Sequence, residues 1–103
     1  MADASKQYSL EEIKALLKKS LKHIRAEYHV KSIGLFGSYV HGEALPDSDL
    51  DVLVDFSKPI GLFKFLELEE YLSDLLKIKI DLVSKNALKP RIGKRILEEA
   101  VYL

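Results

Sequence analysis

The sequence predicts a small α/β domain in which helices pack mainly on one face of a mixed β-sheet, in the order α-β-α-β-α-β-α. Two observations predict this class. Segments with apolar residues at helical spacing alternate along the chain with short segments rich in valine, isoleucine and leucine, as in layered α/β domains. The 103 residues, 48% hydrophobic and 31% charged, are enough for one modest core. We therefore expect a single domain over residues 1–103, frayed at residues 1–8.

The first expected helix covers about residues 9–28, and the first strand follows it directly. Ser9-Leu10-Glu11-Glu12 has the capping-box pattern, in which a serine is followed three residues later by a glutamate. Apolar residues then recur at helical spacing, namely Leu10, Ile13, Leu16, Leu17, Leu21 and Ile24. The apolar run from Val30 to Phe36 predicts the first strand, which ends at Gly37.

The rest of the chain alternates in the same way. We expect a short helix over 38–42, a turn at Leu45-Pro46-Asp47, a second strand over 50–56 and a loop over 57–61. A second long helix then covers 62–76, and a third strand covers 78–83. Residues 86–90 lead into a last helix, whose first turn contains the proline. Its apolar residues at helical spacing are Ile92, Ile96, Leu97, Ala100 and Val101.

Two carboxylates at the start of the second strand point to metal chemistry. Residues i and i+2 of a strand face the same side, so Asp49 and Asp51 project side by side. Adjacent carboxylates repel each other, and a hard divalent cation with oxygen ligands is the commonest reason for a strand to carry them. Upstream, Gly37 allows close approach of the backbone to a ligand, and Ser38 offers an N–H and a hydroxyl. A phosphate-binding turn beside a metal-binding pair is suited to chemistry on a nucleoside triphosphate.

A third carboxylate is expected on the same side of the sheet. Leu50, Val52 and Val54 alternate with Asp51, and in the third strand Ile80 and Leu82 alternate with Asp81. If the long helices cover the apolar sets, Asp51 and Asp81 share the opposite, more open face. Three carboxylates from two strands could hold two metal ions.

These residues resemble the signature of a known family. Gly37-Ser38, nine further residues and then Ser48-Asp49-Leu50-Asp51 are similar to the motif of the DNA polymerase β-type nucleotidyltransferases. The flanking residues and the short chain resemble the minimal nucleotidyltransferase (MNT) branch. The resemblance implies that Asp49, Asp51 and Asp81 are catalytic and bind two magnesium ions. It also implies that Gly37, Ser38 and Ser48 bind the nucleotide, with ATP as the substrate. The family commonly has arginine where this chain has His41.

The resemblance also implies a partner. MNT proteins are often antitoxins of HEPN ribonuclease toxins, so this chain would transfer AMP from ATP to a tyrosine of such a toxin. Two alternatives stay open: an antitoxin that neutralises its partner by binding alone, and nucleotidyl transfer to a small molecule or an RNA. The formal net charge of zero argues against direct nucleic-acid binding. No apolar run approaches the roughly 20 residues of a membrane span, and the absence of cysteines fits a cytoplasmic protein.

Overall fold

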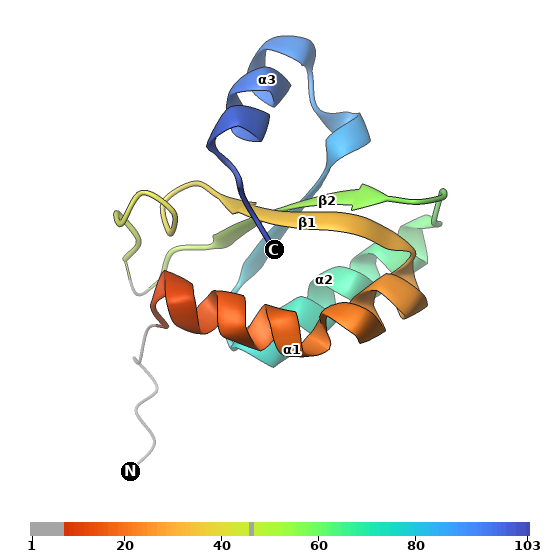
Figure 1. Ribbon diagram of the computed structural model, residues 1–103, viewed down its shortest axis with the longest axis horizontal. Coiled ribbons are helices and arrows are strands. Elements are labelled where there is room, and N and C mark those ends of the chain that lie inside the picture. The colour runs from red at the N-terminus through yellow and green to blue at the C-terminus, as the bar shows by residue number, and fades with distance from the viewer. Residues whose placement is uncertain (1–7, 46) are drawn as a thin grey trace.

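The computed structural model, which describes residues 8–45 and 47–103, has a four-stranded sheet between helices (Figure 1). Helices α1 and α2 lie on one face of the sheet, and α3 stands on the other face. The expected α/β class with a mixed sheet is therefore confirmed. In chain order the elements are α1 Leu10–Tyr28, β1 Val30–Phe36, β2 Leu50–Phe56, α2 Leu62–Leu76, β3 Ile80–Ser84, a 3₁₀ turn η1 Lys85–Ala87, α3 Pro90–Glu99 and β4 Val101–Tyr102.

The strand order is β3-β2-β1-β4, and it brings both ends of the site motif to the centre of the sheet. Strand β1 pairs antiparallel with β2 and with β4, whereas β2 and β3 are parallel. Residues that pair across neighbouring strands face the same side of a sheet. The register places Asp51 opposite Phe36 on β1 and opposite Asp81 on β3.

The core lies between the sheet and the two long helices. Leu50, Val52 and Val54 of β2 are fully buried there, as the alternation of β2 predicted. The same face receives the inner sides of α1 and α2, whose buried members are Ile13, Leu17, Ile24, Tyr28, Leu68, Leu72 and Leu76. The capping box of α1 is present: the Glu12 N–H donates to Ser9 Oγ at 3.2 Å, and the Ser9 N–H donates to Glu12 Oε1 at 3.0 Å. The side of the sheet that carries Asp51 is thereby left to α3.

The helix expected over residues 38–42 is wrong, because the chain makes only one turn there. The N–H groups of Val40 and His41 donate to Gly37 O, and the Glu43 N–H donates to Ser38 O at 2.9 Å. Gly42 has a positive φ of 72°. A left-handed glycine followed by such a bond ends a helix, so the turn stops before a second one can form. The observed order therefore has one α-helix fewer than predicted.

The chain also ends differently from the prediction. The last helix stops at Glu99, and Ala100 is already extended. Val101, which we had placed in the helix, belongs to β4 and pairs with Leu35 of β1. The third strand begins at Ile80 rather than at residue 78. The expectations for residues 1–7 and for Pro46 lie outside the described residues.

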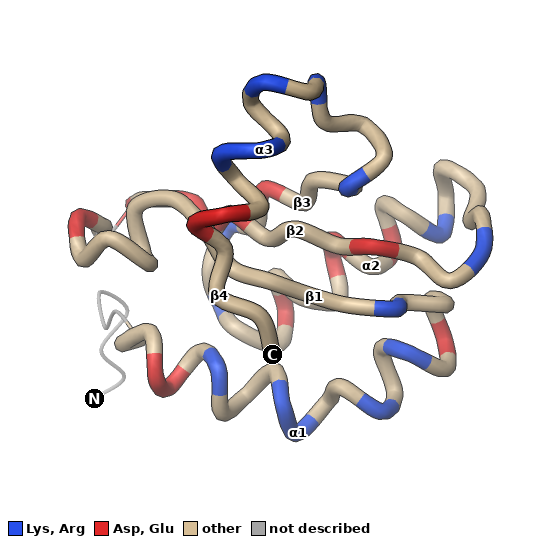
Figure 2. The backbone as a smooth tube through the Cα atoms, turned by 45° about the horizontal axis from the view of Figure 1, so that its top comes forward, with Lys and Arg blue, Asp and Glu red and all other residues tan. Residues whose placement is uncertain are grey.

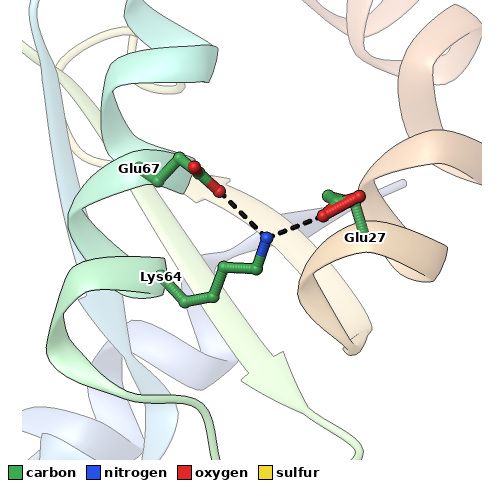
Figure 3. A network of polar contacts seen from close by, with 3 residues as sticks. All are labelled: Glu27, Lys64 and Glu67. Carbon is green, nitrogen blue, oxygen red and sulfur yellow. Dashed lines mark hydrogen bonds and ion pairs between the residues drawn. The ribbon is translucent and has the colours of Figure 1, made fainter.

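A three-residue ionic network joins the two long helices on their outer side (Figure 3). Lys64 Nζ of α2 lies 2.6 Å from Glu27 Oε2 of α1 and 3.0 Å from Glu67 Oε2. The same ammonium lies 5.1 Å from the centre of the Tyr28 ring. The hydrogen bond from Lys64 lowers the pKa of Glu27, and the two carboxylates raise the pKa of Lys64 to about 12.

Among residues 8–45 and 47–103, no helix combines the length and apolarity needed to span a membrane.

Candidate active site

The centre of the candidate site is the pair formed by Asp51 and Asp81. The two residues are partners in the parallel ladder between β2 and β3, so their side chains share one face of the sheet. Asp51 is half-buried and Asp81 is exposed. Burial, the charge of Asp81, a hydrogen bond with Asp81 and the charge of Asp49 together raise the pKa of Asp51 to about 6. The prediction that the two strands bring these carboxylates together is confirmed.

Gly37 lies directly against the Asp51 carboxylate. Its φ of +80° is in the left-handed region that favours glycine. A Cβ atom added there would overlap Asp51 Oδ2 and lie 2.9 Å from Asp51 Cγ. Two independent constraints therefore require glycine at this position. The structure brings the turn predicted to bind phosphate next to the carboxylate predicted to bind metal.

The turn itself, residues 37–43, is held on its inner side by Tyr39. The Tyr39 side chain is 7% exposed and belongs to the core cluster, and Val40 packs against that cluster. The internal hydrogen bonds donated by the N–H groups of Val40, His41 and Glu43 fix the backbone of the turn. Ser38 is half-buried within it. A turn fixed in this way presents its first residues, Gly37 and Ser38, above the start of β2.

Ser48 and Asp49 precede β2 and lie at the margin of the site, outside the Asp51–Asp81 pair. The Leu45 N–H donates to Ser48 Oγ at 2.8 Å, and the Ser48 N–H donates to Leu45 O at 2.9 Å. Ser48 therefore closes the loop in front of Asp49. Asp49 is half-buried, and its charge acts on Asp51. Within the described residues, no three histidine, cysteine, aspartate or glutamate side chains are placed so that they could hold a metal ion. Asp51 and Asp81 are thus the carboxylates that the structure brings together.

Sequence reasoning missed one set of contacts beside this site. His41 Nε2 of the turn lies 3.5 Å from Glu99 Oε2 at the end of α3, and Arg95 Nε lies 3.6 Å from Glu99 Oε1. Figure 2 shows that Lys and Arg residues gather on α3, with acidic residues at its end. The one signal in the sequence was the histidine at a position where the family commonly has arginine. Nothing in the spacing of the residues connects it to Glu99.

Comparison with known proteins agrees with this geometry. The model of the nucleotidyltransferase domain family matches residues 15–103. Protein adenylyltransferase MntA of Thermococcus cleftensis is 52% identical over 95 residues, which cover 92% of this chain and 96% of that protein. A solved structure provisionally described as a minimal nucleotidyltransferase has a TM-score of 0.82 and 35% identity, and the match covers 94% of this chain and 98% of the other.

Two toxin–antitoxin structures share the fold at lower identity. One, solved with AMP-PNP, has a TM-score of 0.70 and 24% identity over 82% of this chain and 69% of the other. The second contains a tri-AMPylated Shewanella oneidensis HEPN toxin in complex with MNT antitoxin. It has a TM-score of 0.65 and 21% identity over 87% of this chain and 70% of the other. With the family model and the 52% identical relative, the resemblance drawn from Gly37-Ser38 and Asp49-Leu50-Asp51 is confirmed. The chain belongs to the nucleotidyltransferase domain family, in its minimal branch of polymerase β type.

Proposed function

We propose that this protein is a magnesium-dependent protein adenylyltransferase that serves as the antitoxin of a HEPN-family toxin, by transferring AMP from ATP to a tyrosine of that toxin. The observation that carries the proposal is the Asp51–Asp81 pair lying against Gly37 on one face of the sheet. The relative that is named for protein adenylyltransferase activity supports the reaction. The fold shared with a HEPN toxin–MNT antitoxin complex supports the partner.

Asp49, Asp51 and Asp81 are the proposed magnesium ligands. Magnesium takes oxygen ligands, usually one or two carboxylates from the protein, and completes its shell with substrate phosphates and water. Asp51 and Asp81 fit this requirement, because two neighbouring carboxylates, one with a raised pKa, are stabilised by a cation between them. Asp49 is near enough for its charge to act on Asp51. Because these three carboxylates are not placed to hold one ion together in this structure, Asp49 would have to shift toward the pair to add a third ligand. When bound, magnesium would neutralise the triphosphate and lower the pKa of the attacking hydroxyl.

Each of these residues would have its own role in the transfer of AMP. The Gly37 N–H and the Ser38 hydroxyl would donate to triphosphate oxygens, and Ser48 would add a contact to the nucleotide while it closes its loop. The exposed carboxylate of Asp81 would accept the proton of the tyrosine hydroxyl. The tyrosine oxygen then bonds to the α-phosphorus. The bond between this phosphorus and the bridging oxygen breaks, and pyrophosphate leaves.

The open position of the carboxylates fits an acceptor that arrives on another protein. Asp81 is exposed on β3, which is an edge strand of the sheet. A macromolecular acceptor can approach such a surface, whereas a deep pocket would admit small substrates only. We therefore propose that the partner protein completes the acceptor side of the site. We also propose that residues 1–103 act as one domain in the cytoplasm.

Labelled ATP tests the proposal directly. The protein is incubated with magnesium, its HEPN-family partner and ATP that carries the label at either the α- or the γ-phosphate. Label on the partner from the α-position only, lost in Asp51→Asn, is the expected result. Asp55→Asn is the matched control, because Asp55 lies on the same strand and the same face but pairs with Lys85 Nζ at 3.9 Å.

The other outcomes separate the competing functions. Label from the γ-position would mean a kinase-like reaction and would contradict the mechanism. No label on the partner, together with an Asp51→Asn protein that still silences the toxin, would favour an antitoxin that acts by binding alone. Label on RNA or a small molecule instead of the partner would leave the chemistry in place and change the acceptor.

A further inference from the structure

The turn after β1 and the end of the chain meet beside the candidate site. Strand β4 pairs with β1 at Leu35 and Gly34, shortly before Gly37. The Leu103 N–H donates to Ile33 O at 3.0 Å, which extends the same attachment. Because α3 leads into β4 with only Ala100 between them, the last turn of α3 is held near residues 37–43.

Glu99 connects these two parts. One carboxylate oxygen lies 3.5 Å from His41 Nε2 on the turn, and the other lies 3.6 Å from Arg95 Nε on α3. The side chain of His41 is 46% exposed and that of Glu99 is 41% exposed. Contacts between charged groups at such exposed positions contribute little to the stability of a fold. The contact is therefore not needed to hold the domain together, and its location beside the turn is what connects it to the site.

The position of Glu99 on its helix points the same way. A negative charge in the last turn of a helix opposes the helix dipole, so a glutamate there does not favour α3 itself. A carboxylate near a triphosphate site also repels the substrate, unless cations neutralise it. His41 Nε2 and Arg95 Nε flank Glu99 on both sides, and the guanidinium of Arg95 supplies a cation for the carboxylate.

We propose that His41 and Glu99 are positioning residues of the nucleotide site. Their contact fixes the outer side of the turn at residues 37–43 to α3, while Tyr39 fixes the inner side to the core. The turn is thus held from two directions, and Gly37 and Ser38 keep the arrangement needed to bind the triphosphate. The inference rests on the proposed function, because it assigns the triphosphate to this turn.

The test measures nucleotide binding apart from transfer. Calorimetry follows the binding of an α,β-methylene analogue of ATP to the wild type, His41→Ala, Glu99→Gln and the double variant. We expect each single variant to bind roughly tenfold more weakly, the lower end of the loss seen when an outer-shell partner that orients a metal ligand is removed. The double variant should bind no more weakly than the singles, because both changes remove the same contact. His41→Arg should bind the analogue as the wild type does, since arginine keeps a hydrogen-bond donor for Glu99.

A matched pair elsewhere separates positioning from general surface charge. Lys14 Nζ and Glu11 Oε1 lie 3.9 Å apart on α1, and the side chain of Glu11 is 81% exposed. Lys14→Ala and Glu11→Gln should leave analogue binding unchanged, and all variants should keep the thermal midpoint of the wild type. Hydrogen exchange gives a second readout: amides of residues 37–43 should exchange faster in His41→Ala and Glu99→Gln.

The outcomes distinguish this inference from the proposed function. If the wild type transfers label but both single variants bind the analogue normally, the positioning role is overturned and the function stands. If the wild type does not bind the analogue, the proposed function fails. In that case unchanged amide exchange at residues 37–43 would also overturn the attachment to Glu99, and faster exchange would support it.

Discussion

Two clusters of charged side chains, one on the helix layer and one on the open face of the sheet, differ in what their charges do for the fold. In the cluster of Glu27, Lys64 and Glu67 the signs alternate, and the pKa shifts of Glu27 and Lys64 favour the charged forms (Figure 3). In the cluster of Asp49, Asp51 and Asp81 all charges are negative. The pKa of Asp51 is raised, which favours its neutral form. The first arrangement stabilises the contact between α1 and α2. The second costs stability, and such a cost is typical of functional sites.

The largest effect is expected from a change that pushes into the second cluster. Gly37→Ala places a methyl group on Asp51 and forces an alanine to a φ of +80°. We expect a loss of about 2 kcal/mol in the free energy of unfolding and a roughly hundredfold loss of transfer activity, because the catalytic groups move apart. Chemical denaturation and labelled-ATP transfer measure the two effects.

Gly42→Ala is the control for this change. Gly42 also has a positive φ, of 72°, but an added Cβ atom would meet nothing within 4 Å. It should cost only the backbone strain, about 1 kcal/mol, and leave most of the activity. Equal losses of activity in the two variants would show that the contact of Gly37 with Asp51 has no special role.

The comparison also shows which parts of the molecule sequence reasoning can reach. Asp51, Asp81 and Gly37 were predicted because local sequence patterns indicate them. The two aspartates alternate with apolar residues in their strands, and the glycine ends a strand. Strand β4 was not, because Ala100 and Val101 continue the helical spacing of Ile96 and Leu97. Only the pairing of Val101 with Leu35, a contact between distant parts of the chain, turns that residue into a strand.

Two details of the site depend on similar long-range or backbone information. The contact of His41 with Glu99 joins residues that are far apart in the sequence, so no spacing rule predicts it. The turn at residues 38–42 has a composition that permits a helix, and its end is decided by the left-handed conformation of Gly42. The chemistry of the candidate site was therefore readable from the sequence, whereas its outer attachments were not.

A smaller effect is expected from removing one charge of the like-signed cluster. Asp81→Asn takes away a negative charge and keeps a similar shape, so the pKa of Asp51 should fall from about 6. It should remain above the ordinary value, because burial, the largest cause of the shift, persists. Carboxyl carbon chemical shifts recorded across a pH titration measure this directly. An unchanged pKa would mean that the two carboxylates do not interact.

The smallest effect is expected in the cluster of alternating sign. Lys64→Met removes the shared cation and leaves Glu27 and Glu67 without it, so the thermal midpoint should fall slightly at low salt. The difference should shrink as salt is added, because screening weakens interactions between exposed charges. Lys64→Arg is the control and should behave like the wild type. Transfer activity should not change, and its loss would contradict the separation of the two clusters.

We infer that Asp51 is kept for function at a cost to the fold, and the pH dependence of stability checks this inference. The free energy of unfolding of Asp51→Asn is compared with that of the wild type from pH 3.5 to pH 8. The folded-state pKa of Asp51, about 6, lies above the ordinary carboxyl value of 3.8. The wild type should therefore lose stability relative to the variant as the pH rises through this interval.

We predict that the two proteins are nearly equally stable near pH 3.5, where Asp51 is protonated in the folded wild type and mostly protonated in the unfolded wild type. Above pH 7 the Asp51→Asn protein should be more stable by about 1 kcal/mol, a value that allows for solvent screening of this half-exposed group, although it transfers no AMP. A variant that is less stable than the wild type above pH 7 would contradict the account, because the carboxylate would then support the fold.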